Sequence, residues 1–162
     1  MKIELGFGTG VQEVVLPEKN VLAVLEANPV SFDLTGEAEV RRALKHPIGS
    51  APLGEIVKPG EKIAIVTSDI TRPCPTAKLL PPVLEELFAA GIRPEDVTVT
   101  FALGSHRCHT EEERKKLMGE AYGLVACRDS DSEHCTLLGT TSRGTPVEID
   151  SAVAGADRRI CF

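Results

Sequence analysis

Two apolar stretches, residues 62–67 and 96–103, are the most strand-like parts of the chain, because both are rich in Ile, Val or Thr. Between them, apolar residues recur at intervals of three and four, which predicts a helix with one buried face. A strand, a helix and a strand joined by short loops predict two parallel neighbouring strands with a right-handed crossover. We therefore expect an α/β fold: a three-layer, mostly parallel, Rossmann-like sheet with peripheral hairpins.

Two adjacent prolines limit where the helix between these strands can begin. Proline lacks the backbone N–H and clashes with the preceding turn, so Pro81 and Pro82 are poor residues for a helix interior. We place the helix at residues 81–90 and interpret residues 76–80 as a preceding turn. Gly91 can supply the left-handed conformation that commonly ends a helix.

Shorter patterns predict the outer elements of the fold. These elements are a hairpin of residues 2–6 and 11–16, a helix at 36–46, a loop at 49–60, a helix at 111–119, a strand at 124–127 and a second hairpin of 135–140 and 146–149. We expect Thr35 to cap the first of these helices, and Thr110 and Glu113 have the spacing of a capping box at the second. Residues 158–162 resemble the start of another apolar strand, so we interpret the chain as a piece of a longer protein.

Composition narrows the class of protein and its partners. A length of 162 residues suits a single domain with a hydrophobic core. The net charge of −6 argues against nucleic-acid binding, since nucleic-acid-binding domains usually present a basic surface. No apolar run is long enough to span a membrane, and the N-terminus lacks the apolar core of a signal peptide. The five cysteines are odd in number and form no C-x-x-C pair, which favours free thiols in a reducing cytoplasm.

Polar loops follow both of the strongest predicted strands. The first strand runs into Ser-Asp-Ile-Thr-Arg-Pro-Cys-Pro at residues 68–75, and the second runs into Gly-Ser-His-Arg at residues 104–107. The carboxyl ends of parallel strands meet at one edge of a sheet, where α/β proteins bind their ligands. We therefore expect Asp69, Arg72 and His106 to converge on one cleft.

Each of these three side chains suits a different task. Arg72 offers a planar fork of donors for a carboxylate or a phosphate. His106 can exchange protons near neutral pH, and Asp69 can orient the arginine, accept a ligand hydroxyl or hold a histidine in one tautomer. The alternatives are structural: an Asp69–Arg72 salt bridge that stiffens the loop, and a histidine that only satisfies local polar groups.

Three further features bear on metals and nucleotides. His106, Cys108 and His109 are metal-ligand types close together, but their spacing matches no common zinc pattern, so we predict no metal site within the chain. The roles of Cys108 and His109 stay open. The chain has neither a G-x-G-x-x-G motif nor a P-loop, so ordinary dinucleotide or nucleoside-triphosphate binding has no support.

The two polar loops together resemble those of a known family. Residues 68–76 are similar to the D-x-T-R-P-x-P motif of the lactate racemase family, the nickel-pincer-nucleotide enzymes. Residues 102–107 resemble that family's second N-terminal motif, G-[ST]-H-R, and the same Thr-Glu-Glu helix start follows. The motifs occur in the right order and spacing, and the resemblance extends over essentially the whole chain.

The resemblance implies an isomerase, a racemase or epimerase of small 2-hydroxy acids. In such enzymes a nickel-pincer nucleotide takes a hydride from the substrate Cα, a histidine removes the hydroxyl proton, and the hydride returns to either face of a planar 2-keto acid. By motif match, His106 would be a catalytic acid/base and Arg72 would bind the substrate carboxylate. The residues that would contact the cofactor or its surroundings are Asp69, Thr71, Gly104 and Ser105.

The same resemblance implies that this chain works with a further domain. The family's cofactor-bonding lysine, nickel-binding histidine and second catalytic histidine lie in sequence beyond residue 162, so a C-terminal domain of the same protein would supply them. We expect the isolated chain to bind no nickel tightly and to racemise nothing. The rival interpretation is a non-enzymatic module that binds a phosphate or carboxylate anion through Arg72.

Overall fold

The computed structural model describes all 162 residues, which form two compact units, Met1–Asp33 and Leu34–Phe162. The first unit is an antiparallel hairpin of β1 (Lys2–Phe7) and β2 (Gly10–Val15), followed by the 3₁₀ helix η1 (Glu18–Asn20). The predicted N-terminal hairpin is therefore confirmed.

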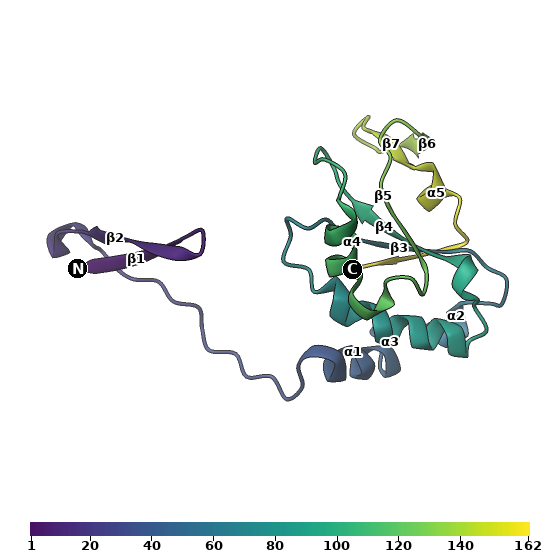
Figure 1. The fold of residues 1–162 in the computed structure, drawn as a ribbon, viewed down its shortest axis with the longest axis horizontal. Helices are drawn as coiled ribbons and strands as arrows, with labels where there is room; N and C mark the ends of the chain where they lie inside the picture. The colour runs from purple at the N-terminus through teal and green to yellow at the C-terminus, as the bar shows by residue number, and fades with distance from the viewer. The chain divides into compact units, whose positions relative to one another are not determined.

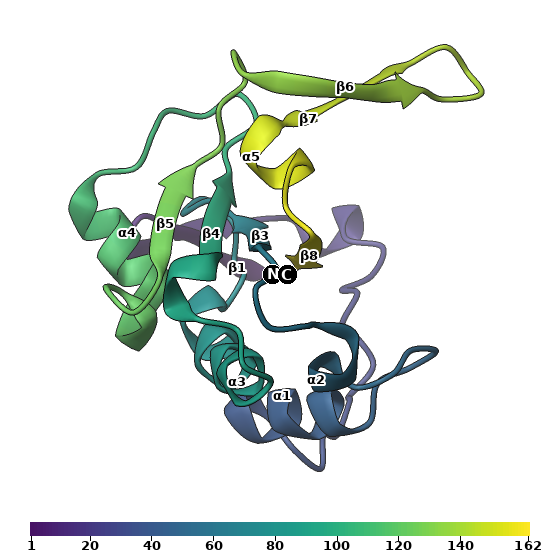
Figure 2. The same cartoon turned by 90° about the vertical axis from the view of Figure 1, so that its right-hand side faces the viewer.

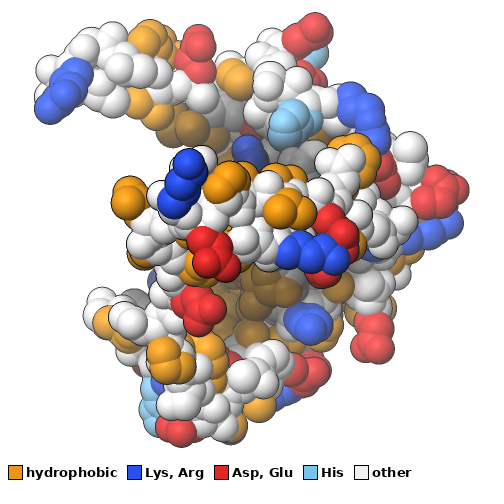
Figure 3. Space-filling model, turned by 90° about the vertical axis from the view of Figure 1, so that its left-hand side faces the viewer, with side chains coloured by type: hydrophobic (Ala, Val, Ile, Leu, Met, Phe, Trp, Pro, Cys, Tyr) orange, Lys and Arg blue, Asp and Glu red, His pale blue; other side chains and the backbone are white.

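The two faces of this hairpin differ in polarity. Alternation along β1 puts Ile3, Leu5 and Phe7 on one face, and the other face carries an ion pair between Lys2 and Glu13. Leu5 and Phe7 remain more than half exposed. Figure 3 shows hydrophobic side chains at the surface, interspersed with charged side chains of both signs.

The second unit is built on a four-stranded sheet in which all strands are parallel, in the order β5-β4-β3-β8 (Figures 1 and 2). The strands are β3 (Ile63–Ser68), β4 (Val97–Ala102), β5 (Ala126–Asp129) and β8 (Arg158–Cys161). The central pair is in register from Ile63 opposite Val97 to Ser68 opposite Ala102. The predicted parallel pair is confirmed, and the strand expected at residues 158–162 forms the sheet edge beside β3.

Helices flank this sheet. α3 (Thr76–Ala89) packs on one face, where Ile65, Val99 and Phe101 are fully buried. α1 (Gly36–Lys45) and α2 (Leu53–Ile56) pack against α3 (Figure 2). The short α5 (Ser151–Ala154) contacts β3 and shares a cavity with Thr98 and Thr100, whose side chains point to the opposite face. The α/β class with a parallel sheet is confirmed.

α3 begins earlier than predicted. The helix starts at Thr76, so Pro81 and Pro82 lie inside it. Both prolines occupy the second turn of α3. Their missing N–H groups therefore leave only two carbonyls, both near the helix start, without the usual partner four residues later. The Thr76 hydroxyl is hydrogen bonded to Thr67 Oγ1 at 2.6 Å in the core, which anchors the first turn to β3. This tertiary anchor outweighs the local preference of the prolines.

The outer elements are mostly those expected. α4 (Glu111–Met118) begins with a capping box in which the Glu113 N–H donates to Thr110 Oγ1 (3.3 Å) and the Thr110 N–H to Glu113 Oε2 (2.9 Å). The second hairpin is confirmed as β6 (Cys135–Thr140) and β7 (Pro146–Asp150). The turn η2 (Pro94–Asp96) precedes β4, and the turn η3 (Gly119–Ala121) follows α4.

Two expectations about the outer elements are wrong. Part of the predicted loop at 49–60 forms α2, and Thr35 precedes α1 without a capping hydrogen bond from its side chain.

All five cysteines are free thiols. None of the helices has both the length and the apolar character that crossing a membrane requires.

Gly119, which ends α4, should tolerate no side chain. Its φ of 55° is left-handed, and an added Cβ would lie 2.8 Å from the Cβ of Ala77. Gly119→Ala should lower the free energy of unfolding, measured by urea denaturation, by about 2–4 kcal/mol. Gly123 is the matched control, because its φ of 84° is also positive but nothing lies within 4 Å of its added Cβ. Gly123→Ala should cost only about 1–2 kcal/mol. Equal losses at the two sites would contradict the importance of the Ala77 contact.

Asp96 should make the stability depend on pH under acid conditions. Its buried carboxylate accepts hydrogen bonds from Arg93 and Lys62, which lower its pKa from 3.8 to about 2. The folded pKa lies below the unfolded pKa, so the stabilisation is complete above about pH 4 and is lost as the pH falls through about 2. Asp96→Asn should flatten the plot of unfolding free energy against pH in this window, measured by urea denaturation. Glu55→Gln, at an exposed residue without an ion pair, is the control, and a slope as steep as the parent's in Asp96→Asn would refute the assignment.

Candidate functional site

Asp69 fixes the loop that follows β3. Its side chain is buried, with 4% exposed. Oδ1 accepts two hydrogen bonds from Thr71, one from the backbone N–H at 2.9 Å and one from the hydroxyl at 2.6 Å. Such a local turn is typical of aspartate in loops, and here it leaves Oδ2 for a partner from another loop.

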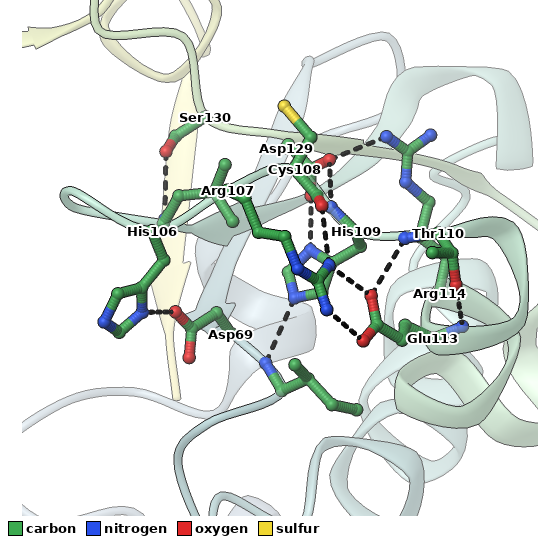
Figure 4. A network of polar contacts seen from close by, with 12 residues as sticks. Asp69, His106, Arg107, Cys108, His109, Thr110, Glu113, Arg114, Asp129 and Ser130 are labelled. Atoms are coloured by element: carbon green, nitrogen blue, oxygen red, sulfur yellow. Dashed lines mark hydrogen bonds and ion pairs between the residues drawn. The ribbon is translucent and has the colours of Figure 1, made fainter.

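The loop after β4 brings His106 to this carboxylate (Figure 4). The His106 N–H donates to Leu103 O at 3.0 Å, and Gly104 adopts the φ of 58° that this tight turn requires. The Leu103 N–H donates to Ser130 Oγ at 3.0 Å, which ties the turn to the residue after β5. His106 Nδ1 is then hydrogen bonded to Asp69 Oδ2, while the His106 side chain is 43% exposed.

The charge on Asp69 determines the tautomer of His106. The hydrogen bonds from Thr71 and from His106 hold the pKa of Asp69 well below its usual range, although burial opposes them. An ionised carboxylate can only accept, so His106 Nδ1 carries the hydrogen of the pair. Nε2 has no protein partner and, in the neutral ring, presents a lone pair at the surface. A histidine held in this way can take up and return a proton.

Two cavities border the imidazole of His106. The smaller, about 190 Å³, is lined by Asp69, Ile70, Thr71, His106, Arg107 and His109. The larger, about 510 Å³, lies between the ends of β4 and β5 and includes Gly104 and Cys108 in its lining. His106 therefore stands between two hollows at the carboxyl edge of the sheet, where the sequence predicted a ligand site.

Arg72 lies apart from this pair. It lines a separate cavity of about 300 Å³ together with Lys78 and Lys116, and its side chain makes no hydrogen bond or ion pair. The Arg72 N–H donates to Asp69 O at 3.1 Å, so the turn carries the arginine away from the Asp69 carboxylate. Of the three residues expected to converge, Asp69 and His106 meet and Arg72 does not. The alternative Asp69–Arg72 salt bridge does not form either.

The polar residues next to His106 in the sequence differ in whether they have hydrogen-bond partners within the protein. The Arg107 guanidinium donates two hydrogen bonds to the Glu113 carboxylate, at 2.7 and 2.8 Å. These bonds and the capping bond from the Thr110 N–H lower the pKa of Glu113 to about 2. Arg107 is thus paired with an acidic side chain, in contrast to Arg72. Ser105 is exposed and its hydroxyl makes no hydrogen bond to the protein.

His109 and Asp129 form a second pair that sequence reasoning did not find. The His109 side chain is 1% exposed, and its ring nitrogens are hydrogen bonded to Asp129 and to the backbone of Ile70. The signal was present, because Asp129 ends β5 and any strand that continues a parallel sheet ends at the same edge. No group of three or more His, Cys, Asp or Glu side chains is arranged to hold a metal ion.

Comparison with known sequences agrees with the loop motifs. The profile described as the lactate racemase N-terminal domain matches residues 7–162. The chain belongs to the lactate racemase family. It is 31% identical over 161 residues to the lactate racemase of Thermoanaerobacterium thermosaccharolyticum, which covers 96% of the chain and 38% of that protein. It is 30% identical over 129 residues to the lactate racemase of Lactiplantibacillus plantarum, which covers 76% of the chain and 30% of that protein.

Solved structures agree with this family assignment. The lactate racemase apoprotein from Thermoanaerobacterium thermosaccharolyticum superposes with a TM-score of 0.82 at 30% identity, over 99% of this chain and 38% of that one. A protein from Thermotoga maritima superposes with a TM-score of 0.57 at 19% identity, over 85% of this chain and 34% of that one, which shows the fold alone. The chain thus spans less than two fifths of the length of the family members it matches.

Thr71 should control the protonation of Asp69 in this family member. Thr71→Val removes the hydroxyl that donates to Asp69 Oδ1, the largest contribution to the lowered pKa, so the titration midpoint of Asp69 should move to higher pH. Carboxyl ¹³C NMR titration measures this shift. Thr71→Ser keeps the hydroxyl and is the matched control, which should titrate like the parent. A parent-like midpoint in Thr71→Val would mean that the hydroxyl does not govern the charge of Asp69.

Proposed function

We propose that the chain is the N-terminal catalytic part of a 2-hydroxy-acid racemase or epimerase that works by hydride abstraction and return, with a 2-keto-acid intermediate. The observation that carries this proposal is the Asp69–His106 pair, an imidazole hydrogen bonded to a carboxylate, with one free nitrogen, at the carboxyl edge of a parallel sheet. Membership of the lactate racemase family supports the reaction class.

In this proposal His106 is the acid/base. Its Nε2 accepts the proton of the substrate hydroxyl, the O–H electron pair forms the carbonyl, and the hydrogen on Cα leaves as a hydride. Asp69 stabilises the imidazolium that results and keeps the ring in one orientation. Return of the hydride to the other face of the planar keto acid, with return of the proton from His106, inverts the centre.

The nickel-pincer nucleotide would supply the hydride acceptor. The residues we assign to its vicinity are Asp69, Thr71, Gly104 and Ser105. Two of them are open to a neighbouring group, since Gly104 has nothing within 4 Å of an added Cβ and the Ser105 hydroxyl is free. The Asp69 oxygens and the Thr71 hydroxyl are bonded within the protein, so these two residues would act on the group's surroundings. The nickel ligand and the lysine bonded to the cofactor are proposed to come from a C-terminal domain of the same cytoplasmic protein.

Arg72 is proposed to bind the substrate carboxylate through its guanidinium fork. Its side chain has no protein partner, so no bond to the protein has to break when it takes an anion. A substrate held by both Arg72 and His106 requires the arginine side chain to turn toward the cavity that contains His106.

A specific observation also favours a second function, the binding of a phosphate or carboxylate without catalysis. Arg72, Lys78 and Lys116 line one cavity, and none of the three has an acidic partner. Such a module would bind inorganic phosphate with an affinity that falls in Arg72→Gln, measured by isothermal titration calorimetry on the purified chain. Under this alternative His106→Ala should leave the affinity unchanged.

The test of the racemase proposal is the variant His106→Ala in the full-length protein loaded with its cofactor. Loss of the proton carrier should lower kcat by about 10²–10⁴, with lactate as the first substrate tested and chiral chromatography as the assay. The thermal melting temperature should stay near the parent value, because the ring is partly exposed. His46→Ala, at an exposed histidine beyond the end of α1, is the control and should retain full turnover. Normal turnover in His106→Ala would refute the assignment.

A further inference from the structure

His109 takes no part in the chemistry proposed above, yet both of its ring nitrogens have partners. Nδ1 lies 2.5 Å from Asp129 Oδ1, and Nε2 accepts the backbone N–H of Ile70 at 3.1 Å. The ring also meets Phe101 edge to face, with centroids 5.1 Å apart. A buried histidine with this set of contacts is held in one place and in one orientation.

These contacts define the protonation of the ring. A backbone N–H can only donate, so Nε2 of His109 must be the unprotonated nitrogen. Nδ1 therefore carries the hydrogen and donates it to Asp129. The neutral Nδ1–H tautomer is the one form that satisfies both partners, because a second proton would direct an N–H at the Ile70 N–H.

Asp129, the carboxylate partner of His109, is itself held by further hydrogen bonds. Asp129 Oδ2 accepts the His109 backbone N–H at 3.1 Å and Arg114 Nη2 at 2.7 Å. Burial raises the pKa of Asp129, but the hydrogen bonds from His109 and Arg114 outweigh it and leave the pKa lowered. His109 is thus anchored to an ionised carboxylate at the end of β5, so its Nε2 is a fixed point in the second unit.

The loop after β4 holds the Asp69–Ile70 dipeptide at two points (Figure 4). His106 binds the Asp69 side chain, and His109, three residues later, binds the Ile70 backbone. The Ile70 N–H belongs to the same planar peptide unit as the Asp69 Cα. Fixing this N–H therefore also fixes the Asp69 Cα, from which the side chain bonded to His106 extends.

We propose that His109 is a positioning residue, which fixes the Asp69–Ile70 peptide against β5 so that Asp69 keeps His106 in its Nδ1–H tautomer. Its relevance to catalysis rests on the proposed function of His106. The positioning itself is a property of this chain and can be measured without any assay of activity.

The test is NMR on the chain of 162 residues with ¹⁵N-labelled histidine, in the parent, His109→Phe and His109→Gln. Phe fills the space of the ring but can neither accept from Ile70 nor donate to Asp129. In His109→Phe the ring ¹⁵N shifts of His106 should change from one tautomer to a mixture, and exchange of the Ile70 amide hydrogen should accelerate by roughly tenfold or more. His109→Gln keeps an acceptor and a donor and should restore both signals in part.

Phe101→Leu separates positioning from stability. This change removes the edge contact with His109 and should lower the melting temperature, but it leaves the hydrogen bonds of His109 in place. The His106 tautomer should therefore stay single in Phe101→Leu. A single tautomer in folded His109→Phe, or an equal change in Phe101→Leu, would overturn the proposal, and His109→Gln decides if His109→Phe does not fold. Normal turnover in His106→Ala would refute the racemase proposal and leave these NMR results standing.

Discussion

The register between β3 and β4 is the constraint on which the candidate site depends. Ser68 lies opposite Ala102, so both strands leave the sheet at the same height. Phe101 lies opposite Asp129 in the next pair, which brings the end of β5 to the same edge. A slip of one residue would turn the buried face of β4 toward the opposite side of the sheet. Because α3 packs against that face, core packing and site geometry enforce the same register.

Buried carboxylates recur at the strand ends of this sheet, and their partners differ between the two edges. At the amino edge, Asp96 is bonded to Arg93 and Lys62. At the carboxyl edge, Asp69 is bonded to His106, and Asp129 is bonded to both His109 and Arg114. Burying a charge is costly unless donors compensate it, and both edges meet this requirement. An arginine or lysine that neutralises a carboxylate keeps its proton. A histidine that donates to a carboxylate has a second ring nitrogen, which is left for another contact.

Much of the fold could be predicted because its signals are local. The β-branched strands, the capping box at Thr110 and the hairpins are each encoded within a few residues. The start of α3 could not be predicted in this way, because a hydrogen bond between Thr76 and Thr67, nine residues apart, holds two prolines inside a helix. The short α2 was likewise missed, since its residues pack against α3 and carry no strong periodic pattern of their own.

The candidate site was only partly readable from the sequence for the same reason. The order of the strands shows which loops share an edge, and this predicted the meeting of Asp69 and His106. It does not show the direction of a side chain within a loop. Arg72 lies one residue after Thr71, but the turn that secures Asp69 carries the arginine to another cavity. The role of His109 was missed as well, because strand order places its partner Asp129, 20 residues away, at the same edge of the sheet but does not show which side chains meet there.

The two histidines of the β4–α4 loop show how burial divides roles between identical side chains. Both rings donate from Nδ1 to a carboxylate at the end of a strand. The His109 ring is 1% exposed and its Nε2 is occupied by a backbone N–H, so it has no capacity left for a ligand. The His106 ring is 43% exposed and its Nε2 is free. The same dyad is therefore closed to ligands at one position and has an accessible ring nitrogen at the other. The closed dyad binds the Ile70 N–H next to Asp69, and under the proposed positioning role this gives a physical reason for the two histidines to lie three residues apart on one loop.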